Sequence, residues 1–353
     1  MKELTSQAVK EFALSHGLDL CGVANIDRFR DAPERRHPAG ILPEAKSVIV
    51  VGKRILRGGW RGIEEGTYWP TYTYFDYHGL LNTLFIQRPL YDLASFIEDH
   101  GWEAAPYYSG VPETQPDIAP LRPGQPAPDV QLAIRIAATA AGLGEIGWSK
   151  VFLTKQFGPR QRFHAIITDA ELEPDPLVKP GTICDRCMEC VRGCHPHAIP
   201  HQREGKTVQI QIKDQTYVWG DTHMGKCALS YHGADATMSP FIHKSMPGWN
   251  FDVSRQALGE EAGYKLAWTM STGKWRATRQ FPSGYLIEGH AKLQEWGVAG
   301  SYGIEGSRGC MRSCFNHLEK TGRIEQSFAG GQFIKRPRWA LPVQVDPNQS
   351  DTR

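Results

Sequence analysis

The sequence lacks any long apolar run, and no window approaches the ~18 uninterrupted apolar residues of a membrane-spanning helix. It also has little net charge. Its 40 Lys and Arg stand against 38 Asp and Glu, so the composition demands neither a nucleic-acid partner nor an anionic membrane. Residues 1–30 contain no basic start followed by an apolar core and a small-residue cleavage site. We therefore expect a cytoplasmic protein without a membrane span, whose thiols are reduced or bound to metal.

A dinucleotide-binding fingerprint is missing as well. The glycines within residues 142–147 close a predicted helix over residues 130–141, whereas the fingerprint has to open one. A nicotinamide site is therefore not expected at this position.

What the sequence does have is a concentrated set of cysteines. Four of the eight form one Cys-x2-Cys-x2-Cys-x3-Cys run: Cys184, Cys187, Cys190 and Cys194. Three thiolates at two-residue gaps can bind three irons of one 4Fe-4S cluster, and the fourth, after a longer gap, points toward a different metal centre. A structural zinc site would instead use two well-separated Cys or His pairs. The spacing predicts iron-sulfur binding.

The remaining cysteines suggest how two clusters share the ligands. Cys310 and Cys314 repeat the three-residue gap, so Cys314 can complete the first cluster while Cys310 turns to the second. The second cluster would be held by Cys194, Cys227 and Cys310. That set is one thiolate short, and Ser307 stands where another cysteine would be expected. Three readings stay open: a 3Fe-4S centre, a 4Fe-4S centre with serine or water on one iron, or an approach of Cys21, which otherwise reads as a small core residue in a strand.

Hydrophobic periodicity predicts an α/β opening. Apolar residues at helical spacing predict a helix over residues 3–16 that ends at Gly17. Residues 48–51 form a short continuous apolar run, which favours a strand in a sheet covered on both faces. Other expected elements are strands at 20–24, 47–52 and 104–110, a helix over 80–99 interrupted near Pro89, the helix over 130–141, and two strands within 152–169 about the turn at Gly158 and Pro159.

Two further stretches carry candidate functional groups. Residues 68–77 are rich in tyrosine and either pack against the sheet edge or line a pocket for a large flat ligand. Arg160 and Arg162 follow the Gly-Pro turn. Arginines are mostly exposed, and the alternative is that one guanidinium faces inward to bind an anion or to hold an acid in place.

Several motifs together resemble a known family. Residues 142–145, 153–163 and 167–172, followed by the cysteine run from Cys184, resemble in that order the core of corrinoid-dependent reductive dehalogenases. The same series is similar to epoxyqueuosine reductase. The resemblance covers residues 140–200 well, the N-terminal half loosely, and residues 228–306 hardly at all.

The resemblance implies an α+β fold in two parts. Residues 1–175 would form a nitroreductase-like α/β corrinoid-binding domain, and residues 176–335 a ferredoxin-like two-cluster iron-sulfur domain. Residues 228–306 would be an insertion that roofs the active site, because long loops often shape specificity. Residues 336–353 would be a C-terminal tail.

The resemblance also implies a chemistry. A cobalamin-type corrinoid in base-off form, reduced to cobalt(I), would cleave the carbon-halogen bond of an organohalide, with electrons arriving through the two clusters from an external donor such as a ferredoxin or flavodoxin. Tyr108 would donate the proton, with Tyr107 or Tyr77 as substitutes. Arg162 would lower the pKa of that tyrosine and receive the halide, with Arg160 as its substitute. Residues implied to bind the cofactor are Tyr77, Gly142, Gly144, Glu145 and Arg160.

Two rival functions remain. Epoxyqueuosine reductase uses the same cofactors on transfer RNA, and it is expected to show a basic face, a helical repeat after the second cysteine motif, and an aromatic residue where Glu145 stands. An electron carrier with two clusters and no corrinoid would explain the cysteines but not the residues before them. The chain also departs from the family pattern, since His195 separates Cys194 from Pro196 and no twin-arginine signal precedes the domain. We expect an organohalide substrate and no nucleic-acid partner.

Overall fold

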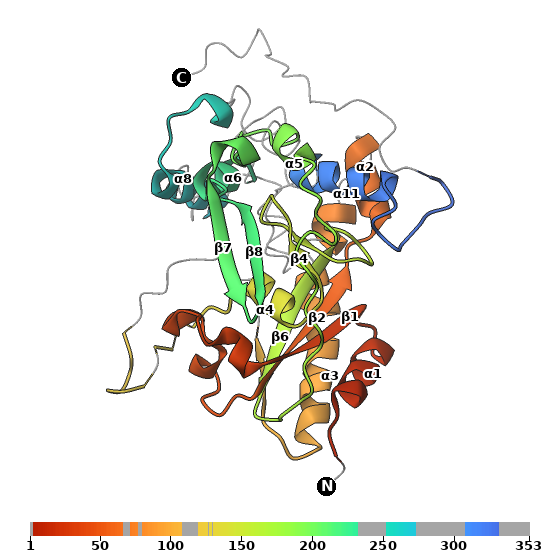
Figure 1. Ribbon diagram of the computed structural model, residues 1–353, viewed down its shortest axis with the longest axis vertical. Helices are drawn as coiled ribbons and strands as arrows, with labels where there is room; N and C mark the ends of the chain where they lie inside the picture. Colours follow the sequence, from red (N-terminus) through yellow and green to blue (C-terminus); the bar gives the residue numbers. More distant parts are fainter. Residues whose placement is uncertain are drawn as a thin grey trace, which may run out of the picture.

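The computed structural model describes residues 3–65, 71–76, 80–107, 119–125, 127–128, 130–231, 252–272 and 308–331. At the centre of the first half lies a four-stranded antiparallel sheet with the strand order β1-β2-β6-β3 (Figure 1). Its strands are β1 (Leu20–Asn25), β2 (Ser47–Arg54), β3 (Ala104–Tyr107) and β6 (Gln161–Thr168). Strand β2 pairs with β6 along its whole length, so these two strands, which are far apart in the sequence, form the centre of the sheet.

Helices cover both faces of this sheet. Val48 and Val50 face one core cluster, and Ile49 and Val51 face the other, as the alternation along a strand requires. Helices α1 (Ser6–Ser15) and α3 (Gln87–Glu98) pack on the Ile49 side. Helix α4 (Ile134–Ala140) and the hairpin of β7 (Thr207–Ile212) and β8 (Gln215–Gly220) pack on the Val50 side. The prediction of a sheet that is covered on both faces is confirmed.

The remaining described helices gather mainly at one end of the sheet (Figure 1). The α-helices among them are α2 (Arg57–Glu65), α5 (Glu189–Arg192), α6 (Met224–Tyr231), α8 (Glu260–Thr272) and α11 (Cys310–Lys320). The short turns are η1 (Ile26–Phe29), η2 (Glu34–Arg36), η3 (Pro38–Gly40), η4 (Thr71–Phe75), η5 (Leu81–Phe85), η6 (Gln202–Glu204) and η7 (Val253–Arg255). The fold is thus mixed helix and sheet. Among the described residues, none of the helices combines the length and the apolar character that crossing a bilayer requires.

Two predicted elements differ in their bounds or partners. The helix expected from residue 130 begins only at Ile134, since Ala133 has a non-helical ψ of 86°. Before it, the Gln131 N–H donates to the Arg35 carbonyl at 3.0 Å. The two strands about Gly158 exist, but they do not pair with each other. Strand β5 (Phe152–Leu153) pairs with β4 (Glu145–Ile146), whereas β6 pairs with β2 in the central sheet.

One apolar core joins segments far apart in the chain. The cluster that contains Ile49 and Ile166 of the sheet also contains Ile183 and, from α11, Met311 and Phe315. Helix α11, which carries two cysteines, is therefore packed into the same core as the first half of the chain. Burial of these side chains is what positions the second cysteine motif.

Gly144 allows the backbone of two segments to approach closely. A Cβ at this position would lie 1.9 Å from the Leu153 carbonyl oxygen, far inside van der Waals contact. Gly144→Ala should therefore lower the free energy of unfolding by about 3 kcal/mol, as overpacking of a tight site does. Chemical denaturation measures the change in the free energy of unfolding. The control is Gly58→Ala in α2, where a Cβ meets nothing within 4 Å. This control should raise the free energy of unfolding by no more than about 1 kcal/mol.

Candidate functional site

Seven of the eight cysteines lie at the helical end of the molecule, and the eighth, Cys21, lies in β1. A small cavity near α5 and α11 is lined by four of the seven: Cys184, Cys187, Cys190 and Cys314. None of the eight cysteines is in a disulfide. The first three come from one loop and the start of α5, and Cys314 comes from α11, which packs against α5. Four thiols from two distant segments thus face one cavity.

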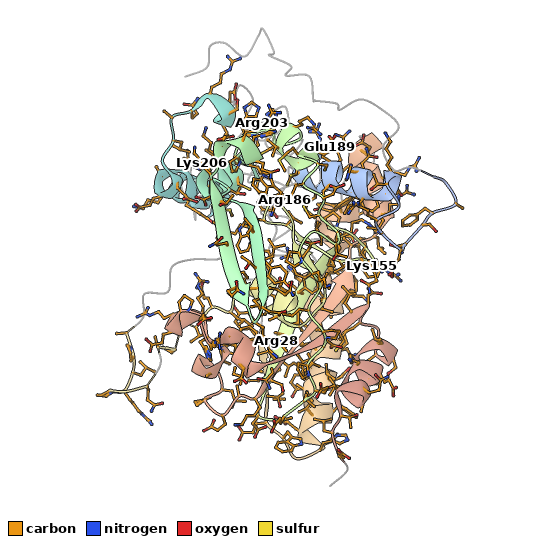
Figure 2. All side chains as sticks on the ribbon, in the orientation of Figure 1. Arg28, Lys155, Arg186, Glu189, Arg203 and Lys206 are labelled. Carbon is orange, nitrogen blue, oxygen red and sulfur yellow. The ribbon has the colours of Figure 1, made fainter. Side chains whose placement is uncertain are left out.

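The loop between these cysteines has an unusual backbone. Arg186 and Met188 both adopt left-handed conformations, with φ of 56° and 60°, which non-glycine residues rarely take. The backbone N–H of Trp148 donates to the Cys184 sulfur at 3.4 Å. Arg186 belongs to this loop and is labelled in Figure 2, and its guanidinium lies 5.7 Å from the centre of the Trp148 ring. Such a tightly wound loop brings successive thiols to the same side, as a cluster requires.

The electrostatics of this cavity call for a cation. Burial, followed by the charges of the neighbouring thiols, raises the pKa of the Cys190 thiol to about 12 and that of the Cys314 thiol well above its ordinary value. Four thiolates side by side, one buried and three half-buried, are unfavourable without positive charge, whereas a coordinating metal deprotonates thiols outright. The set of donors therefore fits an iron-sulfur cluster.

A second group of cysteines adjoins the first. Cys194 is buried, and Cys227 of α6 and Cys310 of α11 pack against the same small apolar cluster, which includes Trp148. The Ala198 N–H donates to the Cys194 sulfur at 3.2 Å. Ser307 lies outside the described residues. These are the three cysteines that the sequence predicts for the second cluster, and Cys190 and Cys184 of the first group also contribute to this apolar cluster.

Cys21 sits elsewhere, in strand β1 of the central sheet, opposite Val51 of β2. It packs against the core cluster on the α1 side, and burial raises the pKa of its thiol to about 12. This environment is that of the small core residue that the strand pattern suggested.

A buried ion pair and a more exposed histidine–carboxylate contact hold α11 beside the cysteine loop. Arg312 donates to both carboxylate oxygens of Glu64 in α2, at 2.6 and 3.0 Å, and both residues are buried. The His317 ring nitrogen lies 2.8 Å from an Asp185 carboxylate oxygen. Sequence reasoning missed these groups. The one available signal was position, because Arg312 and His317 lie two residues before and three after Cys314 on the same helix.

The two candidate arginines have different surroundings. Arg160 is 1% exposed, donates to the Ile55 carbonyl at 2.7 Å, contacts Gln326, and has its guanidinium 4.8 Å from the Phe315 ring centre. Burial lowers its pKa to about 10. Arg162 is half-buried on β6 and donates to the Asn82 side chain at 3.2 Å. Of the two, Arg160 has the inward-facing guanidinium.

The predicted tyrosines fall mostly outside the part of the chain that the structure describes. Tyr77 and Tyr108 both lie there. Tyr107 is described, half-buried at the end of β3, where it pairs with Ala165 of β6. Arg162 lies on this same strand β6, so the backbone brings the candidate arginine and one candidate tyrosine to neighbouring strands.

The residues of the Gly-Leu-Gly-Glu motif make contacts within the protein. Gly142 has φ of 71°, and a Cβ there would lie 2.4 Å from the Pro176 carbonyl oxygen. Gly144 lies against Leu153, as described above. Glu145 is 3% exposed, and its carboxylate accepts hydrogen bonds from the segment that leads into Cys184. The motif thus packs the first half of the chain against the cysteine loop.

A histidine beside Arg162 predicts acid sensitivity. His164 is fully buried, with Nδ1 3.2 Å from the Gln87 amide, and burial, followed by the charge of Arg162, lowers its pKa to about 4. The unfolded chain, with an ordinary pKa of about 6.5, binds the proton more readily, so stability is complete above about pH 6.5 and falls as the pH drops toward 4. The expected loss is about 2 kcal/mol between pH 7 and pH 5.

The variant His164→Gln should flatten this pH dependence, as measured by urea denaturation at the two pH values. The same substitution at exposed His16 controls for the loss of a histidine. An unchanged pH dependence in His164→Gln would show that another group controls acid stability.

No family model matches the chain. Curated relatives do match it in sequence. The tetrachloroethene reductive dehalogenase of Desulfitobacterium hafniense is 30% identical over 164 residues, which are 42% of this chain and 30% of that protein. The protein of the same description from Dehalobacter restrictus matches to the same extent. The one from Sulfurospirillum multivorans is 33% identical over 79 residues. The matched region thus spans about a third of the length of the first relatives.

Solved structures give weaker likenesses. A catabolic reductive dehalogenase has a TM-score of 0.46 and 15% identity, covering 97% of this chain and 42% of that one. Epoxyqueuosine reductase from Streptococcus thermophilus has a TM-score of 0.45 and 15% identity, covering 89% of this chain and 81% of that one. These scores are too low to bear on function. The resemblance to the reductive dehalogenases that the motifs indicated is confirmed by the sequence similarity to the tetrachloroethene enzymes.

Proposed function

We propose that the chain is a reductive dehalogenase-like oxidoreductase that removes a halide from an organohalide, using a corrinoid and two iron-sulfur clusters. The observation that carries the proposal is the cavity lined by Cys184, Cys187, Cys190 and Cys314, which joins two distant cysteine motifs. The sequence similarity to tetrachloroethene reductive dehalogenases supports the class of reaction.

The two groups of cysteines supply the ligands in this proposal. The four cysteines of the cavity hold the first 4Fe-4S cluster. Cys194, Cys227 and Cys310 hold the second, which is a 3Fe-4S centre or a 4Fe-4S centre with a non-cysteine ligand. Because α11 supplies one ligand to each cluster from positions one turn apart, the two clusters are neighbours along the electron path. An external donor such as a ferredoxin or flavodoxin delivers the electrons.

The reaction sets the tasks of the remaining residues. Replacing halogen by hydrogen consumes two electrons and one proton and releases a halide. The corrinoid, when bound, supplies a strongly reducing metal centre for the carbon-halogen bond. In the proposal Tyr108 gives the proton, and Arg162 stabilises the tyrosinate and attracts the halide. Residues 1–175 form the corrinoid-binding part and residues 176–335 the iron-sulfur part.

The fit of the corrinoid to the described residues is weaker than that of the clusters. Gly142, Gly144, Glu145 and Arg160 are already engaged in contacts within the protein. Tyr77 and Tyr108 lie outside the described residues. Gly142, Gly144, Glu145 and Arg160 therefore have no role in the proposed reaction.

Anaerobic reconstitution tests the proposal. The protein is loaded with iron, sulfide and a cobalamin, purified, and examined by metal analysis and EPR. The proposal expects stoichiometric cobalt in base-off form and about seven or eight irons per chain. Loaded protein is then offered haloaromatic compounds and, in parallel, epoxyqueuosine-containing transfer RNA. Halide release supports the proposal. Iron without retained cobalt would leave an electron carrier, and turnover of the transfer RNA alone would identify the rival enzyme.

A further inference from the structure

A single buried carboxylate organises the backbone in front of the first cysteine. Glu145 in β4 is 3% exposed. Its Oε2 accepts from the Gly181 N–H at 2.7 Å, and its Oε1 accepts from the N–H groups of Ile183 and Cys184 at 2.5 and 3.0 Å. Three backbone N–H groups within residues 181–184 are thereby bonded to one side chain. The third donor belongs to a proposed cluster ligand.

The charge of this carboxylate is not matched by a basic side chain. Among the residues that the structure describes, no Lys or Arg forms an ion pair with Glu145, and its hydrogen bonds all come from backbone N–H groups. Backbone N–H groups satisfy a buried carboxylate but carry no net charge to cancel it. The negative charge therefore remains beside the wall of the site.

Glu145 also lines the outer side of the same wall. A cleft between the cysteine loop and β8 is bordered by Glu145, Cys184, Arg186 and Tyr217. The carboxylate is one hydrogen bond away from the backbone N–H of Cys184. Accepting these three N–H groups takes both carboxylate oxygens, which places a negative charge beside a proposed cluster ligand.

We propose that Glu145 is a positioning residue for the first iron-sulfur cluster, which holds residues 181–184 in the conformation that binds iron and lowers the reduction potential of the bound cluster. Cluster potentials depend on nearby net charge, on hydrogen bonding around the ligands and on burial. Outer contacts that orient metal ligands commonly change metal affinity by about 10- to 100-fold when they are removed. The inference rests on the proposed function only in requiring that the chain bind the first cluster.

Two variants separate position from charge. Glu145→Gln removes the charge and keeps the length, but its amide nitrogen cannot accept a backbone N–H. Glu145→Asp keeps the charge and shortens the reach. The matched control is Glu171→Gln, at an exposed glutamate outside the cysteine motifs and outside residues 142–145. Each protein is reconstituted anaerobically with iron and sulfide alone, so that neither the corrinoid nor turnover enters the measurement.

The readouts are iron retained during a chelator challenge and the midpoint potential of the first cluster from an EPR-monitored redox titration. Glu145→Gln should lose iron about 10- to 100-fold more readily and should have a higher midpoint potential than the wild type. Glu145→Asp should lose iron more readily but keep a potential closer to the wild type. Glu171→Gln should match the wild type in both.

The outcomes distinguish the two levels of the proposal. Wild-type protein that takes up no cluster would overturn the proposed function and this inference with it. A loaded wild type, with iron retention and potential unchanged in Glu145→Gln, would overturn the inference alone. If Glu145→Gln does not fold, Glu145→Asp decides the matter, since wild-type iron retention in that variant would refute the positioning role.

Discussion

Replacing Cys314 by alanine is expected to remove about half of the iron that the reconstituted chain binds. Cys314 comes from α11, yet it lines the same cavity as the cysteines of the loop before α5. Its loss leaves an iron of the first cluster without a thiolate in a buried site, and the cluster should disassemble. Iron and sulfide per chain, together with the EPR spectrum of the dithionite-reduced protein, measure the effect.

The complementary variant is Cys227→Ala, which should remove the other EPR signal and spare the one that Cys314→Ala removes. Cys227 packs with Cys194 and Cys310 in the second group and does not line the first cavity. Cys21→Ala is the control, because that thiol lies in the central sheet. Full iron in Cys314→Ala, or loss of iron in Cys21→Ala, would show that the ligands are divided differently between the clusters.

Arg312→Ala should lower the free energy of unfolding by about 3 to 5 kcal/mol, the usual cost of stranding one partner of a buried ion pair. The guanidinium meets both oxygens of Glu64 at 2.6 and 3.0 Å, and the two residues are 9% and 7% exposed. Removing Arg312 leaves the Glu64 carboxylate buried and without this cation. Urea denaturation followed by tryptophan fluorescence measures the change.

The double variant Glu64→Leu with Arg312→Met tests this explanation, because it removes both charges and keeps apolar volume. It should recover most of the stability that Arg312→Ala loses. The exposed pair of Glu261 and Lys265 in α8 is the control, and Lys265→Ala should leave the denaturation midpoint unchanged. A double variant as unstable as Arg312→Ala would mean that the loss comes from packing of the Arg312 side chain and not from the stranded charge.

These two results would also connect stability to the site. Arg312 lies between Cys310 and Cys314 on α11, so the ion pair with Glu64 fixes the helix that supplies one ligand to each proposed cluster. Arg312→Ala should therefore also lower iron retention. Cys314→Ala removes a ligand directly. It should therefore greatly reduce the iron bound per chain and change the free energy of unfolding of the apoprotein only slightly.

Local signals predicted the elements that depend on neighbouring residues. The helix at residues 6–15 and the strands at 20–25 and 47–54 follow from apolar periodicity and short apolar runs. The helix at 134–140 begins later than predicted: Ala133 has a non-helical ψ of 86°, and the N–H of Gln131 donates to the carbonyl of Arg35, far away in the chain. Periodicity within one segment carries no information about such a partner.

The candidate site divides in the same way. The cysteine run can be recognised from the sequence alone, because three ligands of one cluster lie on a single short loop and their spacing reflects the geometry of the cluster. The spacing also indicated the Cys310 and Cys314 pair. It could not indicate that Arg160 is buried against Phe315, that Glu145 accepts three N–H groups ahead of Cys184, or that Glu64 meets Arg312. Those pairings join residues far apart in the chain, and they arise only when the sheet and helices pack around a common core.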